Sequence, residues 1–164
     1  MITIHATGKL RTKTRQPAVP DPPTGTGRLG DWYATDLGWR PGMALFVNEP
    51  TLLPVLVPLA PAKTLGPRFV DQLAVILDAH GCPPAFIDAE IEHAGVQTWA
   101  KTMNRSLVGM LVEFAFIADR HRQVRGTPDP IALSIKLAGT PCSPLYKTHT
   151  FPDRALAALV ACSN

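Results

Sequence analysis

The stretch MALFVNEPTLLPVLVPLA, residues 43–60, carries the clearest β-strand pattern in the chain. Two aliphatic runs flank the polar pair Asn48 and Glu49, and this arrangement predicts a hairpin or a tight strand connection. Pro54 and Pro58 lie in the second run and have no backbone N–H, so we expect that run to be an edge strand or a bulged strand. Such a hairpin would leave an opening beside Asn48 and Glu49.

The spacing of apolar residues predicts the remaining elements. Alternation of apolar and polar residues predicts strands at 1–7 and 131–137. Helical spacing, with proline and glycine near the ends, predicts helices at 67–80, at 84–94, from Ser106 to about Gln123, and at 152–161. The three acidic residues of the helix at 84–94, among them Glu90, are expected to face water.

Strands followed by helices and a late strand favour an α+β domain over a repeated βαβ fold. We expect a small, mostly antiparallel sheet of about four strands packed against three to four helices. A length of 164 residues suits a single domain over 1–164, and a hydrophobic content of 46% is enough for a core. The Pro- and Gly-rich segment at about 16–28 is expected to be a surface loop.

The charge of the chain is mildly basic. The net charge of +3 is weaker than the concentrated charge of a dedicated nucleic-acid-binding domain. Lys9, Arg11, Lys13 and Arg15 alternate along the chain, however, and an extended backbone would place all four on one side. Nucleic acid or an acidic partner is therefore a candidate ligand for these four residues.

Cysteine and histidine usage indicates no metal site and no cofactor. The three cysteines have no CxxC spacing, and the five histidines form no HxxxH or HExxH pattern. The chain has no apolar N-terminal signal segment, and no apolar run approaches the roughly 20 residues of a membrane span. We therefore expect a protein of the reducing cytoplasm that does not enter the membrane.

The segment KTMNRSLVGMLVEFAF, residues 101–116, gathers polar groups at the start of a predicted helix. Asn104 and Arg105 lie at its positive end, which favours an anion or an oxyanion. Gly109 precedes Glu113 by about one turn and weakens the helix, so it indicates close approach by a backbone or a ligand. The alternative is that Glu113 is an ordinary surface residue and that Asn104 and Ser106, the expected N-cap, only cap the helix.

Other polar and aromatic residues near predicted strand ends complete the candidate site. Two carboxylates in unlike environments can divide acid and base roles, provided that the fold brings them together. The candidate catalytic residues are Asp31, Glu49 and Glu113. The candidate substrate-binding residues are Trp32, Tyr33, Asn48, Lys101, Asn104 and Arg105, although aromatic residues such as Trp32 and Tyr33 are more often part of the core or its rim.

Four segments in the same order resemble an uncharacterised bacterial family known as a domain of unknown function. They are RLGDWYA (28–34), LFVNEPTLLPVLVPLA (45–60), KTMNRSLVG (101–109) followed by FAF, and LAGTPCSPL (137–145). Members of that family are sometimes joined to open-reading-frame proteins of plasmids and transposons. The family often has an Asn-Asp pair where this chain has Val112 and Glu113, so the resemblance implies an acidic group there on a longer arm.

Two functions fit these observations. The first is a small hydrolase of a glycoside or phosphoester, in which Glu113 or Glu49 is the general acid or base, Asp31 complements it, and Asn104 with Arg105 orients the substrate. The second is a non-catalytic interaction protein of mobile elements that binds nucleic acid or an acidic partner through its basic residues. The number of polar groups at predicted element ends favours the enzyme.

Overall fold

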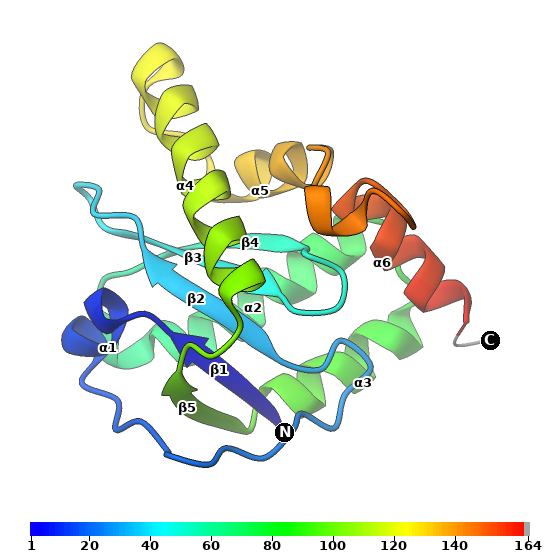
Figure 1. The fold of residues 1–164 in the computed structure, drawn as a ribbon, viewed down its shortest axis with the longest axis horizontal. Coiled ribbons are helices and arrows are strands. Elements are labelled where there is room, and N and C mark those ends of the chain that lie inside the picture. The colour runs from blue at the N-terminus through cyan, green and yellow to red at the C-terminus, as the bar shows by residue number, and fades with distance from the viewer. Residues whose placement is uncertain (163–164) are drawn as a thin grey trace.

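The computed structural model describes residues 1–162 and contains five strands and six α-helices within them (Figure 1). The strands are β1 (Ile2–Ala6), β2 (Trp32–Asp36), β3 (Met43–Asn48), β4 (Pro54–Pro58) and β5 (Gln97–Lys101). The helices are α1 (Gly8–Thr14), α2 (Leu65–Ala79), α3 (Pro84–Ala94), α4 (Arg105–Arg125), α5 (Pro130–Ala138) and α6 (Pro152–Ala161). Two short 3₁₀ helices lie at Ala62–Thr64 and Ser143–Leu145. The expected α+β class is confirmed.

The five strands form one mixed sheet in the order β4-β3-β2-β1-β5. The predicted hairpin is present as antiparallel β3 and β4, and β4 lies at an edge, as its prolines require. Strand β1 pairs in parallel with both β2 and β5. The prediction of a mostly antiparallel sheet with about four strands, packed against three to four helices, was therefore wrong in the strand pairing and in both numbers. Strands β1 and β2 are parallel because α1 and the Pro-rich segment return the chain to the same end of the sheet, and β1 and β5 are parallel because α2 and α3 carry the chain from the β4 edge to the opposite edge.

The two faces of the sheet have separate cores because successive side chains of a strand point to opposite faces. On one face, Ile4, Trp32 and Phe46 pack in a cluster with residues of α2 such as Phe69. On the other face, the cluster joins strand residues to α4 and includes Phe114. Figure 1 shows α4 crossing in front of the sheet, with α2 and α3 behind it.

On the sheet face that carries α4, the Pro-rich segment covers β1. Thr3 and His5 alternate with the buried Ile2 and Ile4, so they point to this second face. The Pro-rich segment between α1 and β2 lies here. The Thr3 hydroxyl donates to the Pro23 carbonyl at 2.6 Å. The predicted surface loop therefore packs against β1.

Several predicted helices have the expected ends. Helix α2 runs over Leu65–Ala79, and Gly81 follows it with φ +76, a conformation that favours glycine. Helices α3 and α6 begin with proline in their first turn, as predicted. Helix α4 begins at Arg105, one residue before the predicted start, because Asn104 rather than Ser106 is its N-cap: Asn104 Oδ1 accepts from the Ser106 N–H at 2.9 Å.

The local structure differs from the sequence-based expectations at three places. The basic segment is helix α1 rather than an extended stretch, so Lys9, Arg11, Lys13 and Arg15 do not form one line. The segment predicted as a late strand is helix α5, which begins where Asp129 Oδ2 accepts from the Ala132 N–H at 3.1 Å. Two strands of five residues each were not predicted, β2 and β5.

Glu90 differs from its acidic neighbours on α3. It was expected to face water, but it is only 3% exposed. Its two carboxylate oxygens accept from the backbone N–H groups of Arg28 at 2.9 Å and Leu29 at 3.2 Å. Glu90 therefore fixes the end of the Pro- and Gly-rich loop on α3.

No helix within residues 1–162 is long and apolar enough to cross a membrane.

Candidate functional site

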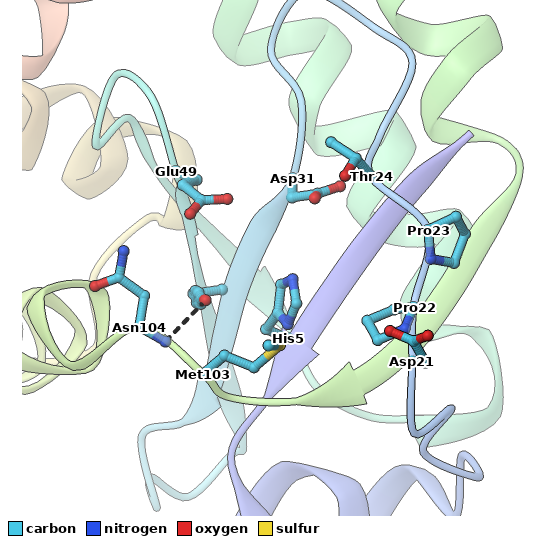
Figure 2. Close-up of a pocket in the computed structure, with 10 residues that line it drawn as sticks. His5, Asp21, Pro22, Pro23, Thr24, Asp31, Glu49, Met103 and Asn104 are labelled. Atoms are coloured by element: carbon cyan, nitrogen blue, oxygen red, sulfur yellow. Dashed lines mark hydrogen bonds between the residues drawn. The ribbon is translucent and has the colours of Figure 1, made fainter.

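A polar cavity lies where β1, β2, the Pro-rich loop and the β5–α4 connection meet (Figure 2). Its volume of about 320 Å³ is within the range of small-molecule sites. The residues that line it are His5, Asp21, Pro22, Pro23, Thr24, Asp31, Tyr33, Glu49, Met103 and Asn104. Four sequence-predicted site residues therefore meet here: Asp31, Tyr33, Glu49 and Asn104.

His5 and Tyr33 form the floor of the cavity. They are opposite one another in the register of the parallel strands β1 and β2, so their rings emerge side by side. The rings stack with centroids 4.7 Å apart and an interplanar angle of 22°. Both residues are buried, with 6% and 2% of their surface exposed. Stacking against a buried neighbour restricts the rotation of each ring and fixes the groups that it presents.

The hydrogen bonding of His5 defines its tautomer. His5 Nδ1 lies 3.0 Å from the carbonyl oxygen of Lys101. A carbonyl only accepts, so Nδ1 carries the hydrogen and donates it, which leaves Nε2 with a lone pair in the neutral ring. Nε2 has no hydrogen bond to another residue of 1–162, and it is not closed off from solvent. It is therefore free to meet a ligand in the cavity.

The Tyr33 hydroxyl is fixed by a hydrogen bond from the backbone. The Asn104 N–H donates to it at 3.1 Å, drawn as a dashed line in Figure 2, so the phenolic hydrogen remains free to donate. Burial raises the pKa of Tyr33, the hydrogen bond from Asn104 partly opposes this rise, and the charge of Glu49 adds to it. Tyr33 therefore keeps its proton at neutral pH and serves as a hydrogen-bond donor.

Asp31 is anchored by the backbone. Its Oδ1 accepts from the N–H groups of Thr3 and Gly25, both at 2.9 Å. A Cβ on Gly25 would lie 2.6 Å from that oxygen, so only glycine allows the loop to approach so closely. Oδ2 has no bond to a described residue. Asp31 thus ties β1 to the loop through one oxygen while the other is available to the cavity.

Glu49 and Asn48 have different roles although they are adjacent. Glu49 lines the cavity directly after β3, and its N–H donates to the Asp31 carbonyl at 3.0 Å. Asn48 is fully buried: its amide donates to the Leu29 carbonyl at 2.7 Å, and its Oδ1 accepts from the Thr51 hydroxyl at 2.8 Å. Asn48 therefore shapes the turn that presents Glu49 and does not line the cavity.

The cavity is acidic. The carboxylates of Asp21, Asp31 and Glu49 line it together with His5, and no Lys or Arg is among the described residues that form its wall. A second hollow of about 310 Å³ shares Pro22 and Met103 with it and also contains Lys101. The charge favours a neutral or cationic ligand in the cavity, since an anion would meet several like charges.

A comparison with known protein families assigns this chain. Residues 3–155, nearly the whole chain, match the model described as a domain of unknown function, DUF6933. The chain belongs to the DUF6933 family. No curated protein and no solved structure matches it. The expected membership of a domain-of-unknown-function family is confirmed, and the polar cavity is therefore a feature of a DUF6933 domain.

Besides Asn48, four predicted site residues of this DUF6933 domain lie outside the cavity. Glu113 and Arg105 are exposed on α4 and do not line it, so the expected hollow shared by Glu113, Asn104 and Arg105 is not present. Nor does anything lie within 4 Å of a Cβ built on Gly109. Trp32 belongs to the core, with 1% of its surface exposed. The side chain of Lys101 is exposed beside the adjoining hollow.

His5 and the loop wall were missing from the sequence-based site. The sequence gives His5 only an alternating position in a predicted strand, because the pairing of β1 with β2 is not visible in it. A histidine at a strand position facing away from Ile4 was nevertheless an available signal. No group of His, Cys, Asp and Glu residues within 1–162 has the geometry of a metal site.

The cysteines do not contribute to the site. Cys142 is buried, and burial, with a smaller effect from Glu113, raises the pKa of its thiol to about 12. Burial also raises the pKa of Cys82. Because the thiolate is the reactive form, neither residue is a nucleophile at neutral pH.

Proposed function

We propose that the cavity is the active site of a small hydrolase that acts on a neutral, oxygen-rich substrate, of which a glycoside is the best example. The observation that supports the proposal is the meeting of His5, Tyr33, Asp31 and Glu49 in one cavity, with His5 Nε2 free. The three carboxylates make a phosphoester the less favourable substrate, because its phosphate would be repelled.

The proposed chemistry is general acid–base catalysis. His5 Nε2 accepts a proton from the attacking water, since its lone pair faces the cavity. Glu49 delivers a proton to the leaving oxygen, and Asp31, fixed through Oδ1, stabilises the positive charge that develops on His5. In the view of Figure 2, both carboxylates are drawn higher than His5, with Asp31 above it and Glu49 to its upper left. Tyr33 and Asn104 are placed to orient substrate hydroxyl groups.

A panel of chromogenic glycosides and phosphoesters tests the proposal. We expect turnover of a neutral glycoside and a fall in kcat of about 100-fold or more in Glu49→Gln, the usual effect of removing a general acid. Glu92→Gln, at an exposed position on α3, is the matched control and should retain full activity. Full activity of Glu49→Gln would overturn the proposal, and so would turnover of phosphoesters alone.

The alternative is a non-catalytic protein of bacterial mobile elements that binds nucleic acid or an acidic partner. The geometry gives it less support than the sequence did. Lys13 pairs with Asp36 at 2.6 Å, and Arg11 Nε donates to the Ala6 carbonyl at 3.2 Å. Among the four basic residues, only Lys9 and Arg15 are exposed without an ion pair or a side-chain hydrogen bond to another residue of 1–162. The proposed setting for either function is a reducing cytoplasm, in keeping with three free cysteines.

A further inference from the structure

The outer face of α4 is apolar at its centre. Val112 is 66% exposed and Phe116 is 62% exposed. They are four residues apart, so they lie on the same side of the helix, one turn from each other. The inner side of α4 is buried on the sheet through residues such as Leu111 and Phe114. Figure 1 shows this helix on the outside of the sheet, with no other helix in front of it.

Gly109 extends this face by one further turn. A glycine weakens a helix interior relative to alanine, and such a position needs a reason. Within the described chain there is none, because a Cβ built on Gly109 meets no atom within 4 Å. The open space above Gly109, Val112 and Phe116 would be filled only by something outside the chain.

Two opposite charges flank Phe116 on one side of this face. Glu113 precedes it by three residues and Arg120 follows it by four, so both lie about one turn from it. Both are exposed, and neither makes an ion pair with another residue of 1–162. The guanidinium of Arg120 lies 5.8 Å from the centre of the Phe116 ring. The face thus has an apolar centre between a negative and a positive end.

We infer that this face binds the same face of a second copy, with the two α4 helices antiparallel and the two-fold axis at Phe116. In an antiparallel pair related in this way, one flank of a helix meets the same flank of its partner in reversed order. Glu113 of each copy therefore lies opposite Arg120 of the other, and two equivalent ion pairs form. The two Phe116 rings meet at the axis, beside Val112 of each copy.

The order of the two charges on α4 favours a second copy of the chain over other binding partners. A nucleic acid would select positive charge along the whole face, and an acidic protein would not tolerate Glu113 at one end. One negative and one positive residue placed on either side of a central aromatic ring match their own reversed copy. This surface contains no residue that lines the polar cavity, so the inference is independent of the proposed hydrolase.

Sedimentation equilibrium of the wild type and of charge variants tests the pairing. We expect a concentration-dependent dimer in the wild type. Glu113→Arg and Arg120→Glu should each raise the dissociation constant by about tenfold or more, because each replaces two attractions by two repulsions. The double variant E113R/R120E should restore dimerisation. A wild-type monomer, single variants that still dimerise, or a double variant that does not would overturn the inference.

Crosslinking gives a second measurement that does not depend on the charge variants folding. In a background in which the exposed Cys162 is replaced by Ser, Phe116→Cys should form an intermolecular disulfide on mild oxidation, because position 116 meets its own copy at the axis. Val96→Cys, at a position that is 63% exposed before β5, is the matched control and should crosslink at most slowly. Equal rates of crosslinking at 116 and 96 would contradict the proposed axis.

Discussion

His5 and Tyr33 stack at 4.7 Å on adjacent parallel strands; His5 is hydrogen-bonded to the last residue of β5, and Tyr33 to the connection that follows it. His5 donates to the Lys101 carbonyl, and the Tyr33 hydroxyl accepts from the Asn104 N–H. The ring pair therefore fixes the connection that closes one side of the cavity. Groups held in this way before a ligand arrives are typical of preorganised sites.

Replacing Tyr33 by Phe tests this link. The change keeps the ring stack but removes the acceptor of the Asn104 N–H, so we expect the free energy of unfolding to fall by about 1 kcal/mol. Denaturant unfolding measures it. Tyr146→Phe is the control, because Tyr146 is 59% exposed and its hydroxyl has no hydrogen bond to a described residue. Equal stabilities of the two variants would show that the hydroxyl does not hold the connection.

Gly25→Ala tests the approach of the loop to Asp31. The added Cβ would lie 2.6 Å from Asp31 Oδ1 and 3.0 Å from the backbone carbon of Gly30, so the loop has to move. We expect a loss of about 1–3 kcal/mol in unfolding free energy, as for other overpacked sites, together with a loss of activity. The matched change Gly8→Ala has its nearest contact at 3.9 Å and should cost nothing. A Gly25→Ala protein with wild-type stability would contradict this geometry.

Glu90→Gln tests the buried carboxylate on α3. Both of its oxygens accept backbone N–H groups, and glutamine has only one acceptor oxygen, so one N–H loses its partner. The expected loss is about 1–3 kcal/mol. Glu92→Gln, exposed on the same helix, should change stability by less than about 0.5 kcal/mol. Similar values for both variants would mean that Glu90 does not fix the loop.

His80 gives a prediction for pH. Burial lowers its pKa, and the charge of Asp153 partly opposes this effect. The folded pKa is therefore below the unfolded value of about 6.5, and the unfolded chain takes up the proton first as the pH falls. Stability due to neutral His80 is present above about pH 6.5 and is lost below it. Between about pH 7.5 and pH 5.5, the wild type should lose more unfolding free energy than His80→Gln. Equal losses would contradict the lowered pKa.

The elements predicted correctly are those whose sequence signals lie within the element or at its ends. The β3–β4 hairpin and helix α2 were correct because prolines, glycine and apolar spacing all agreed there. Helix α5 was misread because IALSIKL alternates like a strand, although Asp129 and Pro130 are suitable helix-start residues. Strand β5 is short and owes its place to pairing with β1, a distant contact that no local pattern reveals.

The candidate site shows the same limit. Asp31 and Glu49 were selected because they adjoin strand ends, and they do share a cavity. Glu113 was selected from helical periodicity, which cannot distinguish a face that meets a ligand from one that meets water. His5 reaches the site only through the register of β1 with β2. Which strands are neighbours depends on the whole fold.

The kinetics of His5→Gln probe the catalytic role of the cavity, because this variant removes the Nε2 lone pair at its floor. On the neutral glycoside that the wild type hydrolyses, we expect kcat to fall by about 100-fold or more, with an unchanged circular dichroism spectrum. Undiminished turnover by a folded His5→Gln protein would contradict it.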